Sequence, residues 1–253
     1  MKHLIRNIFI LLIATTSLNA YAQQYKVVGI TGSKQYLDSR FDRNPDTAVI
    51  SIINRYKGTV DREMSDVVGY SDVYMHSDRP EGLLNDCTAD ILLAESRLFD
   101  KTVTAAFINV GGLRSPIHKG AITKGDVYKL FPFQNTLCIM TLKGSDLRSL
   151  LKEIAIRNGE GISGINMVIT PDHQLVSAHI GKTNIDDNAS YRIATIDYLA
   201  EGNDGMPSFR KGTNRIFPDN ALLRDLMINY LRKLKKENIH LNPHLDGRIT
   251  IKK

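Results

Sequence analysis

The sequence lacks the features that mark several specialised classes of protein. It has no Trp and only 2 Cys among its 253 residues, and 42% of the residues are hydrophobic against 24% charged. It also shows no internal repeat and no low-complexity segment. This composition excludes long disordered, collagen-like and coiled-coil chains. Two cysteines are too few for a disulfide framework, so we expect Cys87 and Cys138 to be buried free thiols, with a single bridge as the alternative.

The common signatures of hydrolytic active sites are also missing. None of the 7 histidines stands two residues after an Asp or directly after an Asn. The D-x-H and G-N-H-[DE] motifs of two-metal phosphohydrolases are therefore absent. H-E-x-x-H, G-x-S-x-G and Walker motifs are absent as well. The sequence predicts no catalytic residue, metal ligand or cofactor in this chain.

The first 22 residues have the pattern of a secretory signal peptide. Lys2 and Arg6 precede an apolar run, residues 8–14, and Ala20-Tyr21-Ala22 follows it. The run is shorter than the roughly 20 residues of a membrane-spanning helix, and no other stretch is long and apolar enough. No Cys stands at the expected cleavage point, which argues against a lipid anchor. We expect an exported, periplasmic or secreted protein without a membrane anchor.

The charge is mildly basic, with 33 Lys and Arg against 27 Asp and Glu, a net +6. Most basic residues are scattered, but one group, Arg232, Lys233, Lys235 and Lys236, closes a predicted helix. Cations at the end of a helix complement the helix dipole, so this group is expected to be a solvated helix end. A nucleic-acid patch is the alternative, and we expect no nucleic-acid polymer as a partner.

Hydrophobic periodicity predicts a mixed order of strands and helices. Strands are expected at residues 25–30, 67–70, 103–110, 136–142, 165–170, 175–180 and 191–196. Helices are expected after a cap at Asp46 and at residues 83–98, 123–130, 145–157 and 219–234, with Ser145 as the N-cap of the third of these ranges. Because some strands follow one another as hairpins, the pattern favours a single α+β domain over a regular βαβ winding.

Three loops carry residues suited to binding a ligand. In the first, Gly111 and Gly112 allow a tight turn after a strand that ends at Asn109, and Arg114 can bind a carboxylate or phosphate with two hydrogen bonds. A plain turn with a surface arginine is the alternative. The second loop places Phe133 two residues before Asn135, although a buried Phe133 would explain the same pattern.

The third loop leaves a strand at residue 196 and presents Tyr198 before the acidic, Gly-flanked turn that contains Asp204. A helix C-cap followed by a type I′ turn is the simpler explanation.

Together these loops resemble the C-terminal domain of 5′-nucleotidases. The segments NVGGLRSPI, KGAIT, FPFQNTL, LKGSDL, YRIATIDYLAEGNDGMPSF and DGRI follow one another in the order and spacing of that family, between about residues 67 and 251. The resemblance implies a mixed αβ domain with helices packed on a mixed sheet. It divides the chain into a signal peptide (1–22), an N-terminal extension (23–62) and the 5′-nucleotidase C-terminal-like domain (63–253).

The resemblance also implies roles for six residues. Phe133 and Tyr198 match the two aromatic rings that sandwich the base, and Asp204 matches the acid that holds the ribose hydroxyls. Arg114 matches an arginine facing the phosphates. Asn109 and Asn135 match polar contacts near the base and sugar, and Arg97 is a further arginine that aligns only loosely.

In the family, the metals and hydrolysis belong to a separate N-terminal domain, and the residues before position 67 are too few to form it. The resemblance therefore implies the nucleotide-binding component of a split 5′-nucleotidase, with two divalent metals in a separately encoded metallophosphatase. A stand-alone module that binds nucleosides or nucleotides without hydrolysing them is the alternative.

Overall fold

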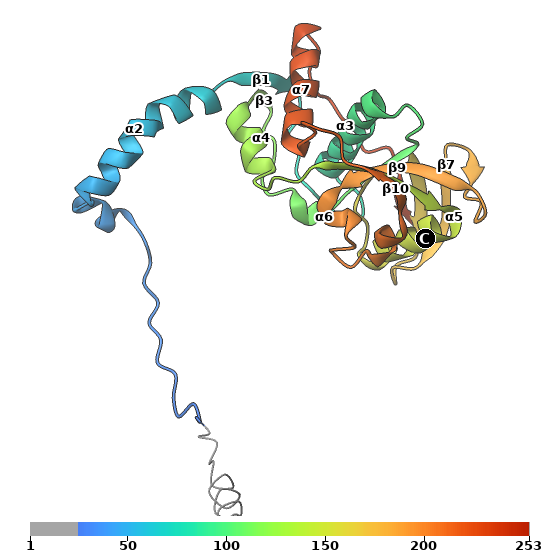
Figure 1. Ribbon diagram of the computed structural model, residues 1–253, viewed down its shortest axis with the longest axis horizontal. Coiled ribbons are helices and arrows are strands. Elements are labelled where there is room, and N and C mark those ends of the chain that lie inside the picture. The colour runs from blue at the N-terminus through green and yellow to red at the C-terminus, as the bar shows by residue number, and fades with distance from the viewer. Residues whose placement is uncertain (1–24, 253) are drawn as a thin grey trace, which may run out of the picture. The chain divides into compact units, whose positions relative to one another are not determined.

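The structure, a computed structural model, describes residues 25–252 (Figure 1). The chain divides into two compact units, residues 1–51 and 52–253. The described part of the first unit contains the 3-10 helix η1 (Ser39–Arg43) and the beginning of α2 (Thr47–Met64). The strand predicted at residues 25–30 is wrong: this segment has no regular structure and is exposed throughout. The predicted signal peptide lies outside the described residues.

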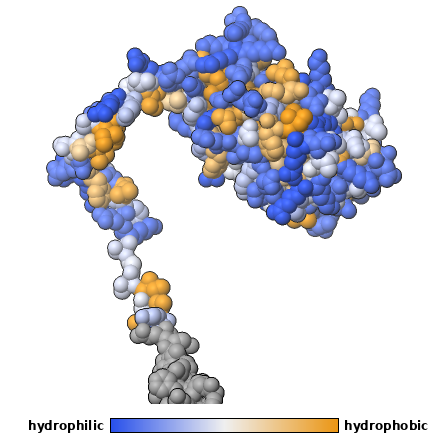
Figure 2. All heavy atoms as spheres, viewed as in Figure 1, coloured by the Kyte–Doolittle hydropathy of each residue, from blue (hydrophilic) through white to orange (hydrophobic). Residues whose placement is uncertain are grey.

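Helix α2 begins where the sequence predicts. The Asp46 carboxylate accepts hydrogen bonds from the backbone N–H groups of Ala48 and Val49, at 2.8 and 3.2 Å, as an N-cap does. No residue of α2 is buried, and its apolar side chains form exposed patches along the helix (Figure 2). The boundary between the two units falls inside this helix, after residue 51.

A five-stranded mixed sheet, in the order β10-β4-β9-β2-β5, forms the centre of the second unit. Its strands are β10 (Thr213–Ile216), β4 (Leu137–Lys143), β9 (Ser190–Ile196), β2 (Ala105–Ile108) and β5 (Gly161–Ser163). Strands β2 and β9 run parallel, and the other neighbours are antiparallel. All four residues of β2 and most of β4 are buried, as expected for strands covered on both faces.

Two smaller sheets complete the β structure. One pairs β1 (Val67–Ser71) with β3 (Gly120–Thr123); the other has the order β11-β6-β7-β8. The strands of the second are β11 (Ile249–Ile251), β6 (Ile165–Ile169), β7 (Leu175–Ile180) and β8 (Thr183–Asn184). Strands β6 and β7 form the predicted hairpin, with His173 of its turn at a φ of 64°. The short strands β3, β5, β8, β10 and β11 were not predicted.

The helices of the second unit are α3 (Leu83–Phe99), α4 (Lys124–Leu130), α5 (Gly144–Ile156), α6 (Asp197–Ala200) and α7 (Leu223–Lys236), with 3-10 turns η2 (Val110–Gly112) and η3 (Pro207–Lys211). Helix α3 packs on β2 and β5, and α5 contacts β4 and β9. The prediction of an α+β domain with helices on a mixed sheet is confirmed, although the strands form three sheets. No helix within residues 25–252 has the length and apolar character needed to span a membrane.

Two helix starts differ from the predictions. Ser145 is not the N-cap of α5: Lys143 occupies that position and makes no side-chain cap. Helix α7 begins at Leu223, after residues 219–222 have formed a turn and an isolated bridge to Thr136. The basic group does close α7, and Arg232 pairs with Asp66 at 2.7 Å.

Both cysteines are buried and free, as expected. Burial raises the pKa of Cys87 to about 12 and that of Cys138 to about 11. Both side chains are therefore neutral thiols at neutral pH and contribute to packing rather than to chemistry.

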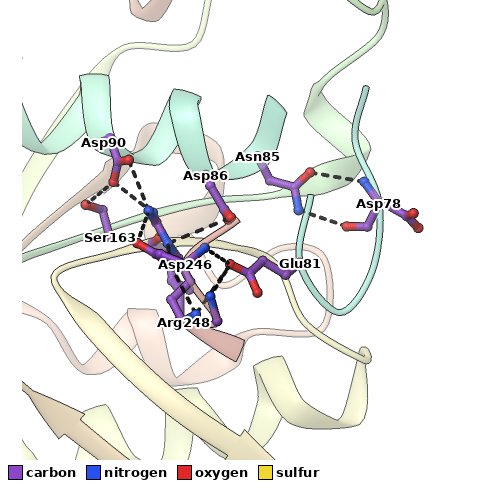
Figure 3. Close-up of polar contacts among 10 residues, drawn as sticks. Asp78, Glu81, Asn85, Asp86, Asp90, Ser163, Asp246 and Arg248 are labelled. Atoms are coloured by element: carbon purple, nitrogen blue, oxygen red, sulfur yellow. Dashed lines mark hydrogen bonds and ion pairs between the residues drawn. The ribbon is translucent and has the colours of Figure 1, made fainter. Parts of the chain in front are cut away.

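Arg248 joins the C-terminal turn to α3 through a cluster of charged side chains (Figure 3). Its guanidinium, in a residue only 8% exposed, donates to both carboxylate oxygens of Asp90, at 2.8 and 3.1 Å, and to both of Asp246, at 2.9 and 2.8 Å. Ser163 donates to Asp90 as well, at 2.6 Å. The C-terminal DGRI segment is thus joined to α3 by the ion pair of Arg248 with Asp90, whose side chain is 49% exposed, and to β5 by the hydrogen bond from Arg248 to the Ile162 carbonyl at 2.9 Å.

Asp86 is the least compensated acid of this cluster. It is 1% exposed, and neither of its carboxylate oxygens has a hydrogen-bond donor among the described residues. Burial raises its pKa to about 8; Arg248 opposes this shift and Glu81 adds to it by its charge and by a hydrogen bond. Glu81 itself accepts three backbone N–H groups of the turn at residues 246–248. A proton on Asp86 donated to Glu81 gives one Asp86 oxygen a partner and removes the repulsion between the two carboxylates.

Candidate functional site

The second unit contains a cavity of about 490 Å³ that brings the predicted site residues together. Its lining includes all six: Asn109, Arg114, Phe133, Asn135, Tyr198 and Asp204. The volume lies within the range typical of small-molecule sites. The backbone of Gly111 and Gly112 and the side chain of Arg157 complete the wall.

The order and direction of the strands explain why distant loops meet here. Because β2 and β9 are parallel, the loops that follow them leave the same end of the central sheet. Strand β4 is antiparallel to β9 and begins with Leu137 opposite Ile196, the last residue of β9. Strand β5 begins with Gly161 opposite Ile108, the last residue of β2. The segments before β4 and β5 therefore reach the same end of the sheet as the loops after β2 and β9.

In the loop after β2, the side chain and the carbonyl of Asn109 both lie against the backbone of Gly112. The N–H of Gly112 donates to the Asn109 carbonyl at 3.0 Å, and a Cβ on Gly112 would lie 2.9 Å from the Asn109 Oδ1. Glycine thus permits this close approach. Asn109 is 4% exposed and donates from Nδ2 to Asp204 at 2.6 Å, but its Oδ1 has no partner among the described residues. An unpaired buried acceptor in a cavity wall is suited to a ligand donor.

The segment between α4 and β4 exposes Phe133. This ring is 52% exposed, whereas Phe131 is buried at 3%, so the alternative of a core Phe133 is wrong. The segment is held by backbone bonds: the N–H of Arg114 donates to the Leu130 carbonyl, and the N–H of Leu223 donates to the Asn135 carbonyl. An apolar ring is thereby fixed at the cavity with much of its surface open to solvent.

The segment after β9, which starts with the short helix α6, joins the second aromatic residue to the acid. Tyr198 is 40% exposed, and its hydroxyl donates to Asp204 at 2.8 Å. That hydrogen bond raises the pKa of Tyr198, so the phenol stays protonated. Gly202, Asp204 and Gly205 all have positive φ, at 75°, 53° and 69°, which bends the turn back toward the cavity. The Asp204 carboxylate thus connects Tyr198 to Asn109.

The cavity has a second arginine that the sequence did not reveal. Arg157 follows α5 and lines the cavity, and its Nε donates to Glu160. Arg97, by contrast, donates from α3 to the Val103 carbonyl and does not line the cavity. The only feature of the local sequence that marks Arg157 is that it precedes Glu160, which stands between two glycines. This pattern does not indicate that strand β5 would place Arg157 beside the turn that carries Asp204.

Glu160 organises this side of the site. It is 1% exposed and accepts from Arg157, from Arg79 at 2.8 Å and from the backbone N–H of Val110 at 2.6 Å. Arg79 also donates to the carbonyls of Arg157 and Gly159. One buried carboxylate therefore fixes both the Arg157 side chain and the start of the Gly-Gly loop.

The cavity wall contains no histidine and one carboxylate, Asp204. Among residues 25–252, the one group of ligand-type side chains close enough to share a cation is Glu81, Asp86 and Asp246, whose oxygens lie within 4.8 Å of one another. This group lies in the Arg248 cluster, and no member of it lines the cavity. What the cavity offers chemically is two aromatic faces, an acid, two amides and two guanidinium groups, which suits recognition of a polar, partly anionic aromatic ligand.

Residues 67–211 match the family model described as the 5′-nucleotidase, C-terminal domain, and the chain belongs to this family.

Its relatives are longer proteins. The chain is 28% identical over 233 residues to the trifunctional nucleotide phosphoesterase protein YfkN of Bacillus subtilis (strain 168), covering 84% of this chain and 16% of the relative. It is 28% identical to an apyrase of Anopheles gambiae, over 74% of this chain and 36% of the relative. The crystal structure of a 5′-nucleotidase precursor from Thermus thermophilus matches with a TM-score of 0.69 and 25% identity, over 81% of this chain and 43% of that one. The chain thus spans less than half the length of each.

Proposed function

We propose that this chain is the nucleoside- and nucleotide-binding component of an exported 5′-nucleotidase-type phosphohydrolase that takes part in nucleotide breakdown. The base lies between Phe133 and Tyr198, and Asp204 accepts hydrogen bonds from the ribose hydroxyls. Arg114 binds the 5′-phosphate. The amides of Asn109 and Asn135 contact the base and sugar, with the unpaired Asn109 Oδ1 as an acceptor.

One observation supports this proposal more than any other. Two aromatic side chains that are 65 positions apart in the sequence, each 40% or more exposed, line the same cavity as Asp204. The Asp204 carboxylate is already oriented by two hydrogen-bond donors. Exposed rings beside a concave surface are suited to stacking on a flat ligand, which contributes roughly 1–3 kcal/mol per base.

Removing either ring should weaken the binding of adenosine. We expect Phe133→Ala and Tyr198→Ala each to lower the affinity by the roughly 1–3 kcal/mol of a lost stacking face, measured by isothermal titration calorimetry. Tyr198→Phe keeps the ring and should lose less than Tyr198→Ala. Tyr74→Ala removes a tyrosine that is 49% exposed and does not line the cavity, and it serves as the matched control. Unchanged affinity in both folded Ala variants would contradict the stacking pose.

Hydrolysis is assigned to a second chain in this proposal. The chain itself carries neither the D-x-H nor the G-N-H-[DE] motif, so a separately encoded, exported metallophosphatase would supply the two divalent metals and act on the phosphate held by Arg114. A neighbouring reading frame with both motifs would identify that chain. In the alternative, the protein binds nucleosides or nucleotides without hydrolysing them.

Arg114→Lys should separate the two possibilities. Lys cannot form the bidentate pair that Arg makes with phosphate, so we expect roughly tenfold weaker binding of 5′-AMP and nearly unchanged binding of adenosine. The pure chain should show no chelator-sensitive turnover of 5′-AMP. Adding wild-type chain to the metallophosphatase should raise turnover more than adding Arg114→Lys. No effect of either chain on turnover would favour the binding module.

A further inference from the structure

The Tyr198 hydroxyl gives Asp204 a contact that an aromatic ring alone does not provide. It donates to the Asp204 Oδ1 at 2.8 Å, while the Asn109 Nδ2 donates to the Asp204 Oδ2 at 2.6 Å. Two donors on different oxygens fix the plane of the carboxylate, whereas one donor leaves the carboxylate free to rotate about a single hydrogen bond. The orientation of Asp204 therefore depends on Tyr198 as well as on Asn109.

The turn that carries Asp204 contacts Tyr198 at a second point. The Asn203 Nδ2 donates to the Tyr198 carbonyl at 2.8 Å. Asp204 has a φ of 53°, a backbone conformation that is uncommon for residues other than glycine, and the hydrogen bonds to Tyr198 stabilise the turn that contains it. Tyr198 thus binds this turn through both its backbone and its side chain, and its ring lines the cavity.

The two side-chain hydrogen bonds leave acceptor capacity on both oxygens of Asp204. An ionised carboxylate offers about four lone-pair sites, two on each oxygen. The hydroxyl of Tyr198 and the amide of Asn109 use one site on each oxygen. One site on each oxygen therefore remains, and two hydroxyl groups on adjacent carbons of a ligand can donate to both oxygens at once.

We propose that the Tyr198 hydroxyl is a positioning group that sets the preference of the site for a ribose with free 2′ and 3′ hydroxyls. This inference rests on the proposed function, in which the Tyr198 ring stacks on the base and Asp204 receives the ribose hydroxyls. One side chain then acts on two parts of the ligand, because its ring contacts the base and its hydroxyl orients the acid that binds the sugar. Without the hydroxyl the carboxylate rotates, and its two remaining acceptor sites no longer face the diol together.

The test compares adenosine with 2′,3′-dideoxyadenosine by calorimetry. Wild-type protein should bind adenosine roughly tenfold or more tightly, the ratio expected for hydrogen bonds to a charged acceptor. Tyr198→Phe should weaken adenosine binding roughly threefold to tenfold but leave that of the dideoxynucleoside within about twofold, because the stacking ring is retained. Tyr74→Phe removes the hydroxyl of an exposed tyrosine outside the cavity and is the matched control, for which both affinities should equal those of wild type.

A second variant shows whether the hydroxyl acts through Asp204. Asp204→Asn replaces one acceptor oxygen with a donor, so the ratio of the two affinities should fall below about threefold. Adding Tyr198→Phe to Asp204→Asn should then leave the ratio unchanged, since the group that the hydroxyl orients is already lost. If Tyr198→Phe weakens adenosine binding as much in this background as in wild type, the hydroxyl acts independently of Asp204, which overturns the positioning role.

The outcomes separate this inference from the proposed function. If wild-type protein binds neither nucleoside, the proposed function fails and the inference fails with it. If nucleosides bind but Tyr198→Phe leaves the ratio as in wild type, or weakens both ligands equally, the positioning role is wrong while nucleoside binding stands. Equal affinities of wild-type protein for the two nucleosides would also overturn it, because Asp204 would then not bind the diol. Thermal unfolding of each variant checks that the fold is intact.

Discussion

Asp86→Asn should make the protein more stable at alkaline pH than the wild type. The folded protein holds a proton on Asp86, whose pKa burial raises to about 8, and the unfolded chain releases that proton near the ordinary value of 3.8. Because the unfolded state then binds fewer protons than the native state, this group lowers the free energy of unfolding as the pH rises from 4 to 8. Asn keeps the shape and the donor of the neutral acid and does not ionise.

The expected effect is large. With about 1.4 kcal/mol for each pKa unit, the penalty on wild type reaches on the order of 5 kcal/mol at pH 8. Urea unfolding at pH 5, 6, 7, 8 and 9 should show a stability difference between Asp86→Asn and wild type that grows up to about pH 8 and is constant beyond it. Acids whose pKa is lowered, such as Asp100 and Asp246, affect the free energy of unfolding only below about pH 5. They are present in both the wild type and Asp86→Asn, so they do not contribute to the difference.

A matched control comes from an exposed acid. Asp187 pairs with Arg148 at 2.8 Å, with a side chain that is 55% exposed, and Asp187→Asn should leave the pH dependence between 5 and 9 as in wild type. A constant difference between Asp86→Asn and wild type over this range would mean that Asp86 is ionised in the folded protein.

Glu160→Gln should lower both stability and ligand binding. The change leaves Arg79 and Arg157 without their shared carboxylate and places an amide N–H₂ against donors it cannot pair with. Breaking a buried ion pair costs 3–5 kcal/mol, and because the two arginine side chains are 27% and 30% exposed we expect about 2–3 kcal/mol in urea unfolding. Binding of adenosine should weaken as well, because Glu160 holds the Val110 N–H at the start of the Gly-Gly loop that lines the cavity.

Glu63→Gln is the control for charge removal alone. Glu63 pairs with Lys124 at 3.0 Å and its side chain is 63% exposed, so its loss should cost less than about 1 kcal/mol. Equal losses of stability in the two variants would show that Glu160 contributes no more than a surface charge.

Sequence patterns sufficed for the elements and residues whose signals are local. The periodic apolar spacing of residues 83–98 predicted α3, and Asp46 predicted the start of α2. The short strands β5 and β10 have no such signal, since each is defined by the neighbour it pairs with. Residues 25–30 show the converse: their alternating side chains are typical of a strand, yet this exposed segment is irregular.

The residues of the site also divide into those that local sequence patterns predict and those that only the fold reveals. Phe133, Tyr198 and Asp204 lie in loops whose order and spacing resemble a known family, so their meeting at one cavity could be expected before the fold was seen. Arg157 reaches the cavity, and Glu160 holds it there, because β5 is antiparallel to β2, which no local pattern shows. That Asp86 holds a proton depends on burial beside Glu81, a property of packing alone.

The meeting of four chain segments at one end of the central sheet has a consequence for how recognition can diverge. The sheet's hydrogen bonds involve residues within the strands, whereas Phe133, Tyr198, Asp204 and Arg157 all lie outside them. Ligand preference can therefore change by substitution in the segments that flank the strands while the pairing register stays the same. In evolutionary terms, the scaffold tolerates new specificities at little cost to folding. Glu160 is the exception, because this one side chain contributes both to the stability of the fold and to the shape of the binding site.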